Sequence, residues 1–458
     1  MTKDTKGSPN GSLDRRSLFG AAAAAITGPV MTKTAIASSK VRAPKVLAPK
    51  FLAPTPPMGW NSWNSFATTI NEAQALETAH IMAAKLLPAG YDIFTIDIQW
   101  YEPGATSYEY SKNPQPTMDG YGRLIPAPNR FPSGFTKIAS QVHALGLRFG
   151  IHLMRGIPRL AVEKNLPVFG TSFHARDIAN TNSTCPWNPD MYGVDMTKPG
   201  AQAYYDSVFG LYASWGVDFV KMDDMSRPYD AHIHEIEGAH KAIVKTGRPM
   251  LLSLSPGETP VPRGNHVQNY AQMWRISDDF WDDWKLLESQ FTRLENWNAF
   301  RRPGAWPDAD MLPLGRLALG SRDTKFTPDE QRTLMTLWGI ARSPLIMGGD
   351  LRYLDQPTLE LLANPEVIAV NQKSTDNQPH FYADDTRVWT ARPETGAGHY
   401  LALFNTGNAP MTVSFPLEAL GLKTVKVRDL WARADTGQAT GVVKADLPPH
   451  GAGLFKLT

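Results

Sequence analysis

The stretch Val217-Asp218-Phe219-Val220-Lys221-Met222-Asp223-Asp224-Met225 predicts a buried strand that ends in charged side chains. Its first half is mostly apolar, as expected of a parallel strand buried on both faces. A lysine and two aspartates then end the apolar run. In α/β barrels, the carboxyl ends of the strands form the rim where active sites lie. A surface turn would also explain the Asp-Asp pair, because aspartate is common in turns. The rest of the chain decides between these two interpretations.

Seven further apolar segments predict short strands, and helical patterns separate them. These strands are expected at residues 58–60, 93–97, 147–152, 250–254, 273–277, near 305–306, and at 344–347. The helical patterns cover residues 71–86, 135–145, 200–215, 232–246 and 329–340. Eight strand–helix repeats over residues 56–372 predict an α/β fold, a closed (β/α)8 TIM barrel.

The pattern of the chain changes after residue 372. Short alternating apolar runs at residues 387–391, 400–405 and 411–415 are separated by Gly, Asn and Pro. Such runs are typical of antiparallel strands. They predict a C-terminal antiparallel β-sandwich over residues 373–458.

The first residues have the features of an export signal. Arg15-Arg16 precedes an Ala-rich stretch, and Ala35-Ile36-Ala37 provides a small-x-small cleavage site. This predicts a twin-arginine signal peptide over residues 1–37, followed by a Pro/Ala/Lys-rich linker over residues 38–55. The apolar stretch is too short to span a membrane, so no membrane span is predicted. We expect a periplasmic or secreted protein, which has a single cysteine, Cys185, and therefore no internal disulfide.

Composition narrows the class of partner. The formal net charge is +2, and the chain has no dense Lys/Arg run, which argues against a nucleic-acid partner. The chain holds 13 tryptophans. Large cores also use Trp, but an exposed indole offers a flat apolar face to a sugar ring. Nothing in the sequence predicts the oligomeric state.

Charged side chains gather where the predicted strands end. A barrel would bring Asp97, Asp223 and Asp279 to one face, together with Lys221 and Arg275. Such carboxylates suit glycoside hydrolysis, in which one attacks the anomeric carbon and another protonates the leaving oxygen. Clustered aspartates could instead hold a metal ion, but the interleaved cations would repel a dication. We therefore predict an oligo- or polysaccharide substrate, with no metal and no other cofactor.

Six ordered motifs resemble glycoside hydrolase family 27, the family of α-galactosidases and α-N-acetylgalactosaminidases. The resemblance extends from Thr55 to the C-terminus, with fitting spacings. The motifs are Pro57-Met58-Gly59-Trp60-Asn61-Ser62-Trp63-Asn64, Lys221-Met222-Asp223, Trp274-Arg275-Ile276-Ser277-Asp278-Asp279, and the segments at residues 303–312, 337–345 and 364–372.

The resemblance implies a role for each matching residue. Asp223 would be the nucleophile and Asp279 the acid/base, which implies a retaining mechanism with the two carboxyl groups ~5 Å apart. The remaining matches would bind substrate: Trp63 as a platform under the sugar, Asp97 at the axial hydroxyl and C6, Lys221 and Arg275 at hydroxyls, and Asp310 as a further active-site carboxylate.

Each expected catalytic aspartate has an aspartate neighbour that could take its place. Asp224 follows Asp223, and Asp278 precedes Asp279. Successive strand residues point to opposite faces, so only one of each pair can face the barrel centre. The motifs favour Asp223 and Asp279.

Three positions depart from the family pattern. Ile98 stands where a second carboxylate is expected, and an isoleucine cannot bond a hydroxyl. Ser255 stands where an α-galactosidase has a glutamate facing O2, and His152 where the family has a tyrosine. Because they occupy these positions, Ser255 and His152 are candidate substrate-binding residues.

The resemblance implies a retaining α-glycosidase that acts on terminal α-galactosides, and the N-terminal signal adds that it is exported. Ile98 and Ser255 leave other sugars open, namely an α-N-acetylgalactosaminide, a β-L-arabinopyranoside or an α-glucan of the isomalto type. A non-hydrolytic carbohydrate-binding protein is the alternative from another class. A binding module, however, has no use for a nucleophile–acid pair.

The segment 152–195 is longer than the family pattern requires. A long loop above a barrel rim is usually functional or disordered. Trp187 and Tyr192 favour an ordered lid over the sugar, and a structural flap is the alternative.

Overall fold

The computed structural model describes residues 51–458, apart from the side chains of residues 381 and 382. The expected signal peptide and residues 38–50 of the expected linker lie outside the described residues. Residues 51–458 belong to one compact unit. Within residues 51–458, no helix has the length and apolar character needed to cross a bilayer.

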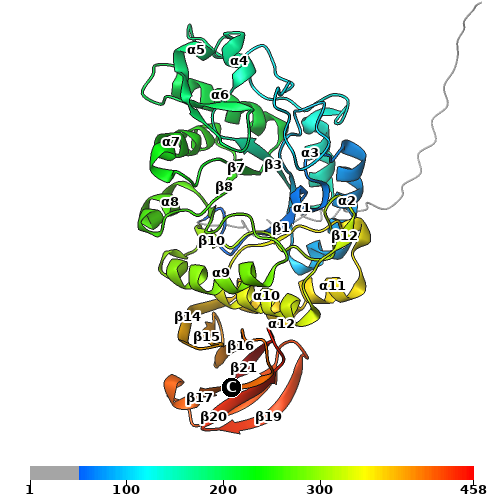
Figure 1. The fold of residues 1–458 in the computed structure, drawn as a ribbon, viewed down its shortest axis with the longest axis vertical. Helices are drawn as coiled ribbons and strands as arrows, with labels where there is room; N and C mark the ends of the chain where they lie inside the picture. The colour runs from blue at the N-terminus through cyan, green and yellow to red at the C-terminus, as the bar shows by residue number, and fades with distance from the viewer. Residues whose placement is uncertain (1–50) are drawn as a thin grey trace, which may run out of the picture. The chain divides into compact units, whose positions relative to one another are not determined.

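An eight-stranded parallel sheet forms the first part of the described chain, as predicted, and helices surround it (Figure 1). The two edge strands of this sheet are brought together, because Leu312, which follows one edge strand, pairs in parallel with Met347 in the other. In sheet order, the strands are β10 (Trp306–Asp308), β9 (Met273–Arg275), β8 (Leu251–Leu254), β7 (Phe219–Asp223), β3 (Arg148–Met154), β2 (Ile93–Ile96), β1 (Met58–Asn61) and β13 (Leu345–Met347).

Every predicted strand has a counterpart in this sheet, because each is an apolar run buried on both faces. The close packing inside the barrel explains a glycine in β3. A Cβ on Gly150 would lie 2.6 Å from Thr95 Oγ1 and 3.0 Å from the ring of Phe219. Gly150 therefore leaves room for Phe219, which begins the strand that carries Asp223.

The predicted helices are also present, and local signals explain where they begin. Asn71 and Gln74 form a capping box at the start of α2. Thr327 and Glu330 form another at the start of α10, where Pro328 occupies the first turn. The predicted helices are α2 (Glu72–Lys85), α3 (Gly134–Ala144), α6 (Ala201–Trp215), α7 (Tyr229–Thr246) and α10 (Pro328–Ala341); α8 (Gly264–Tyr270) and α9 (Trp284–Trp297) were not predicted.

The C-terminal part is built of antiparallel strands, as predicted. Its own apolar core includes Leu401, Leu403 and Phe415. A six-stranded sheet has the order β14 (Ser374–Ala383), β15 (Thr386–Pro393), β16 (His399–Asn405), β21 (Ala452–Leu457), β18 (Thr424–Asp429) and β19 (Ala434–Thr440), and β17 (Met411–Pro416) pairs with β20 (Val442–Leu447).

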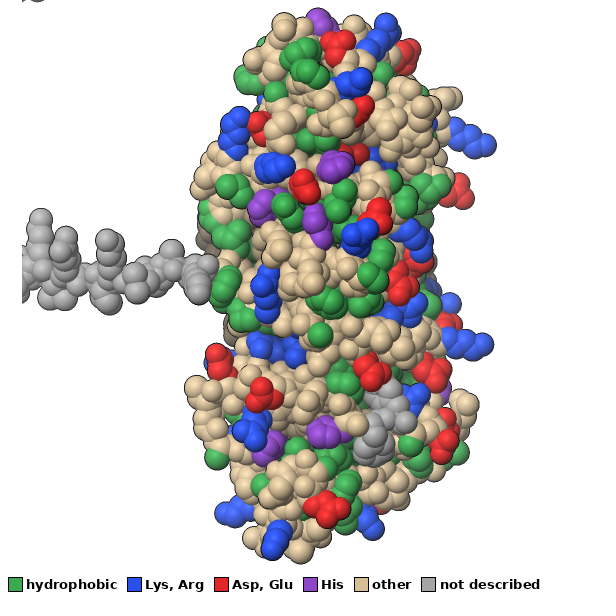
Figure 2. Space-filling view, turned by 90° about the vertical axis from the view of Figure 1, so that its left-hand side faces the viewer, with side chains coloured by type: hydrophobic (Ala, Val, Ile, Leu, Met, Phe, Trp, Pro, Cys, Tyr) green, Lys and Arg blue, Asp and Glu red, His purple; other side chains and the backbone are tan. Residues whose placement is uncertain are grey.

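The sandwich packs on helices α9 and α10 of the barrel. The ring of His450 stacks on Trp284 with centroids 3.7 Å apart. Its Nδ1 lies 2.7 Å from Glu330 Oε1, and its carbonyl accepts a hydrogen bond of 2.6 Å from Thr333. Acidic and basic side chains are interspersed over the face seen in Figure 2, so this face carries no continuous basic surface.

The segment 152–195 is ordered and forms a small antiparallel sheet of its own. The strand order is β4 (Ile157–Pro158), β6 (Met191–Val194) and β5 (Ala179–Thr184). Two short helices, α4 (Arg159–Glu163) and α5 (Ala175–Ile178), complete it. The insertion follows β3 directly, so it stands at the carboxyl end of the barrel strands.

Candidate active site

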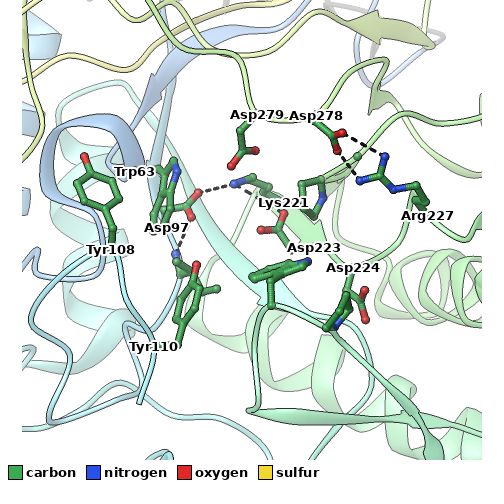
Figure 3. A pocket seen from close by; sticks show the side chains of 15 residues that line it. Trp63, Asp97, Tyr108, Tyr110, Lys221, Asp223, Asp224, Arg227, Asp278 and Asp279 are labelled. Atoms are coloured by element: carbon green, nitrogen blue, oxygen red, sulfur yellow. Dashed lines mark hydrogen bonds and ion pairs between the residues drawn. The ribbon is translucent and has the colours of Figure 1, made fainter. Parts of the chain in front are cut away.

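A cavity of about 460 Å³ lies at the carboxyl ends of the barrel strands. Figure 3 shows several carboxylates and a lysine converging on it from different strands. Among the predicted site residues, Trp63, Asp97, Lys221, Asp223 and Asp279 line the cavity, together with Ile98, Tyr108, Tyr110, Pro186, Trp187, Asp224, Arg227, Pro256, Gly257 and Asp278.

Asp223 ends strand β7 and is held by three neighbours. Ser255 Oγ donates a hydrogen bond to Asp223 Oδ1, and Lys221 Nζ lies 3.7 Å from the same oxygen. His152 Nε2 lies 2.9 Å from Oδ2, although the contact is poorly aligned for a hydrogen bond. Burial by itself raises the pKa of Asp223, but Lys221 and then His152 outweigh it and bring the pKa well below 3.8. The Asp223 carboxylate is therefore ionised and fixed in orientation.

Lys221 joins Asp223 to a second carboxylate. Its ammonium donates a hydrogen bond of 3.0 Å to Asp97 Oδ2, which also accepts one of 2.7 Å from Asn61. Burial lowers the pKa of Lys221, but the charges of Asp223 and Asp97 outweigh burial and raise it above 10.5. Lys221 thus remains a cation beside the cavity.

Asp279 and its neighbour Asp278 point in different directions. In Figure 3, Asp279 is turned toward the centre of the cavity and Asp278 toward Arg227. Arg227 donates bonds of 2.8 and 3.1 Å to Asp278. The side chain of Asp279 is 49% exposed, and the Arg275 guanidinium lies 3.4 Å from its Oδ1. Asp279 is therefore the carboxyl of the pair that faces the centre of the cavity and is not held in a two-bond ion pair.

Asp224 also lines the cavity, but an arginine holds its carboxylate in the same way. Arg155 donates bonds of 2.8 and 3.0 Å to Asp224 Oδ2, and a third of 2.6 Å to Glu235. Asp224 has a φ of +62°, which turns its side chain away from that of Asp223. The geometry thus favours Asp223 over Asp224, as the motifs do.

Four predicted substrate-binding residues do not line the cavity. Ser255 and His152 are buried and contact Asp223 from behind. Arg275 is 2% exposed and pairs with Asp310 at 2.8 Å. In this structure, these residues orient carboxylates rather than face the open cavity.

A buried carboxyl beside Asp310 gives a testable pH effect. Burial, with a smaller effect of Asp310, raises the pKa of Asp308 to about 7. In the unfolded chain, Asp308 titrates near its ordinary value of 3.8. Between these values the folded protein binds more protons than the unfolded chain. This group therefore lowers the free energy of unfolding as the pH rises from about 4 to 7.

We expect Asp308→Asn to flatten this dependence, because the amide does not ionise and its oxygen can still accept the 3.0 Å bond from the Asp310 N–H. Between pH 4 and 8, the wild-type protein should lose on the order of a few kcal/mol more stability than the variant. Urea unfolding at a series of pH values measures the difference. Parallel pH curves for the two proteins would contradict it.

One wall of the cavity is aromatic, and its residues were not among the predicted site residues. Tyr108 and Tyr110 line the cavity from the long connection between β2 and α3. Tyr110 lies parallel to Trp63, with centroids 6.4 Å apart, and Tyr108 meets Trp63 edge-on at 5.1 Å. The length of the connection was the available signal, because long loops in βα units are often functional.

The insertion contributes one wall of the cavity through Pro186 and Trp187. Trp187 lies 5.7 Å from Tyr110, so it continues the aromatic surface. The expectation for Tyr192 is wrong. It belongs to strand β6, where the guanidinium of Arg159 lies over its ring at 4.9 Å, and it does not line the cavity.

Within residues 51–458, no three His, Cys, Asp or Glu side chains come together in an arrangement that could hold a metal ion. The cations at Lys221 and Arg275 occupy the space between the carboxylates instead. The chemistry available to these residues is nucleophilic attack by a fixed carboxylate and proton transfer by a more exposed one.

Comparison with known proteins gives consistent matches over the whole described chain. The family model described as alpha galactosidase A matches residues 55–198 and 190–373, and the model of the alpha galactosidase C-terminal beta sandwich domain matches residues 383–457. The α-galactosidase of Coffea arabica is 30% identical over 413 residues, covering 88% of this chain and 94% of its own. That of Cyamopsis tetragonoloba is 29% identical over 410 residues, covering 88% and 86%. A crystal structure of a β-L-arabinopyranosidase of family 27 from Geobacillus stearothermophilus is 48% identical, with a TM-score of 0.87, covering 89% of this chain and 97% of that one.

Proposed function

The chain belongs to glycoside hydrolase family 27, and from this premise we propose that it hydrolyses terminal β-L-arabinopyranosides with net retention of the anomeric configuration. A β-L-arabinopyranoside has the ring configuration of an α-galactoside but lacks the C6 hydroxymethyl group. The substrate proposal therefore depends on what the cavity offers near C6.

Ile98 is the observation that carries the proposal. It lines the cavity beside Asp97, at the position where the family resemblance implies a second carboxylate. Asp97 can accept a bond from the C4 hydroxyl, but the isoleucine has no polar atom for a hydroxyl on C6. Burying that hydroxyl without a partner costs free energy, so a sugar that lacks it is favoured. The arabinopyranosidase from Geobacillus stearothermophilus, 48% identical, supports the same choice.

The proposed reaction proceeds in two displacements. In the first, Asp223 attacks the anomeric carbon while Asp279 gives its proton to the leaving oxygen. This forms a glycosyl ester on Asp223 and releases the aglycone. In the second, Asp279 takes a proton from water, the water oxygen attacks the anomeric carbon, and the ester bond breaks. Two inversions at the same carbon give retention.

The neighbours of Asp223 have roles in both displacements. Lys221 and Ser255 stabilise the carboxylate before attack and again when it leaves the anomeric carbon. Trp63 offers its face to the sugar ring. Arg275 and Asp310 hold Asp279 from below, through the 3.4 Å contact between Arg275 and Asp279.

α-Galactosides, the substrates first expected from the sequence, are the second candidate. The α-galactosidases of Coffea arabica and Cyamopsis tetragonoloba, about 30% identical over nine-tenths of the chain, favour them. In that case, another group would have to bond the C6 hydroxyl in place of the missing carboxylate.

A panel of p-nitrophenyl glycosides tests the proposal. We expect kcat/KM for the β-L-arabinopyranoside to exceed that for the α-galactoside by about tenfold or more, since pockets reject an extra group by that order. The α-N-acetylgalactosaminide and the α-glucoside should be poorer still. Ile98→Asp should shift the ratio of the first two toward the galactoside.

Ile98→Val is the matched control for this panel, because it keeps the wall apolar and should keep the wild-type preference. If the α-galactoside is the better substrate and Ile98→Asp leaves the ratio unchanged, the arabinopyranoside assignment is wrong. Sugar binding without turnover of any glycoside would favour the non-hydrolytic alternative.

We also propose that the enzyme is exported, to the periplasm or out of the cell. The Arg15-Arg16 pair, the Ala-rich stretch and the cleavage site at Ala35-Ile36-Ala37 support this.

A further inference from the structure

We propose that the cavity contains a second sugar subsite, on its leaving-group side, formed by Trp187, Arg227 and Asp278. This inference rests on the proposed glycosidase function and specifies its substrate: a glycoside whose aglycone is itself a neutral sugar.

The cavity is larger than one sugar requires. A pentopyranosyl unit occupies roughly 150 Å³ at the packing density of organic solids. The cavity measures about 460 Å³. The residues assigned to the first sugar, Trp63, Asp97 and Lys221, account for only part of its lining. Room for a second ring is therefore present.

Part of the remaining lining lies on the side where a leaving group must go. The acid Asp279 has to reach the glycosidic oxygen, so the aglycone extends past it. In Figure 3, Asp97 and Trp63 lie on one side of Asp223, whereas Asp278 and Arg227 lie on the other. Asp278 is adjacent to Asp279 in the chain.

Trp187 provides an apolar face on the wall of the same cavity, next to Tyr110. All 13 tryptophans fall within residues 51–458, and Trp187, at 37% exposure, is the one that is exposed. An indole left in water on a cavity wall is a typical sugar platform, because a pyranose can cover it with its C–H face. Tyr110 contacts the indole at a tilt, with ring centroids 5.7 Å apart.

Arg227 and Asp278 provide the polar side of the subsite. The two side chains form a two-bond ion pair and are 60% and 63% exposed, respectively. Ion pairs this exposed contribute little to the free energy of unfolding. Gly257, with a φ of +89°, lies next to the pair: a Cβ there would lie 3.3 Å from Arg227 Cβ and 3.6 Å from Asp278 Oδ1. The pair therefore presents fixed donors and an acceptor at the cavity rim.

These groups favour a neutral sugar. A flat apolar face with donors and an acceptor beside it matches the C–H face and hydroxyls of a pyranose. An acidic sugar is disfavoured, because Asp278 already neutralises Arg227 and would repel a carboxylate. A flat aromatic aglycone would use Trp187 but leave the ion pair without a partner.

The test compares three aglycones on one glycone: β-L-arabinopyranosyl-galactose, methyl β-L-arabinopyranoside and phenyl β-L-arabinopyranoside. We expect the wild-type enzyme to have the highest kcat/KM for the disaccharide. Trp187→Ala should lower the disaccharide-to-methyl ratio about tenfold, the order of an aromatic contact. Trp187→Phe should restore most of it. Arg227→Ala should lower the disaccharide-to-phenyl ratio about fivefold, as expected for lost hydrogen bonds.

Tyr121→Ala is the matched control, because Tyr121 is an aromatic of similar exposure, 38%, that does not line the cavity. It should change neither ratio. Unchanged ratios in Trp187→Ala, or a wild-type preference for the phenyl glycoside over the disaccharide, would overturn the subsite. If the arabinopyranosides are not hydrolysed but α-galactosides are, the proposed substrate fails, and the same ratios measured on the α-galactosyl series decide the subsite. If neither glycone is hydrolysed, both proposals fall.

Discussion

Asp223→Ala is expected to lower kcat by on the order of 10⁴-fold or more, as removal of a covalent nucleophile does in other hydrolases. Without Asp223, no glycosyl-enzyme can form, while Asp279 and the sugar-binding wall stay in place. The carboxylate also neutralises Lys221 in a buried setting, so its loss removes charge stabilisation as well. The measurement is kcat on the preferred p-nitrophenyl glycoside, with circular dichroism to check that the variant folds.

Added azide distinguishes a nucleophile from a residue that merely shapes the site. In Asp223→Ala, the space of the lost carboxylate is open, and azide can attack the anomeric carbon from that face. We expect partial recovery of the rate and a glycosyl azide of inverted configuration, identified by NMR. Asp224→Ala is the matched control: Asp224 is paired with Arg155, so its loss should cost stability, with no azide product. Azide rescue of Asp224→Ala instead would reverse the assignment.

The architecture could be predicted because the barrel strands are short apolar runs with turn residues between them. Strand β7 is typical: Phe219-Val220 is buried on both faces, and the charge begins where the strand meets the rim. Helix α9 was not predicted, although its apolar residues recur at helical spacing and provided a usable signal. Leu287, Phe291 and Leu294 are buried, whereas most of its remaining residues are polar or exposed.

The degree to which each site residue is buried could not be predicted. Arg275 and Asp279 are four residues apart, and a strand-end pattern places both at the rim. In the structure, Arg275 is 2% exposed, whereas the Asp279 side chain is 49% exposed. Asp310 has a φ of +82°, and its carboxylate accepts a 2.7 Å bond from the Phe280 N–H. Such burial depends on tertiary contacts between loops, which no local pattern encodes.

The local sequence gave even less indication of the aromatic wall of the cavity. Tyr108 and Tyr110 lie in an irregular connection, and Trp187 lies between the strands of an insertion. Their contacts with one another and with Trp63 join segments that are more than 40 residues apart in sequence. Composition indicated aromatic surfaces for sugars but could not say which residues provide them.

Asp279→Ala should produce a loss that depends on the leaving group. General acid catalysis contributes on the order of 10²–10⁴-fold, and it matters most when the departing oxygen is a poor leaving group. We therefore expect kcat/KM for a disaccharide to fall about 10³-fold. A 2,4-dinitrophenyl glycoside, whose leaving group needs no proton, should be affected far less in kcat/KM. Steady-state kinetics on the two substrates measure the difference.

The second step gives an independent test, because Asp279 must also activate the water that cleaves the glycosyl ester. In Asp279→Ala, the ester on Asp223 should accumulate with the activated substrate, visible as a burst of dinitrophenol. Azide needs no base, so it should speed turnover and give a glycosyl azide of retained configuration, the opposite of the Asp223→Ala product. Asp278→Ala is the neighbouring control: Asp278 is held by Arg227, so its loss should produce neither a burst nor an azide product. Opposite azide configurations from the two variants would assign the nucleophile and the acid/base to Asp223 and Asp279. The same configuration from both would exclude a double displacement with these two roles.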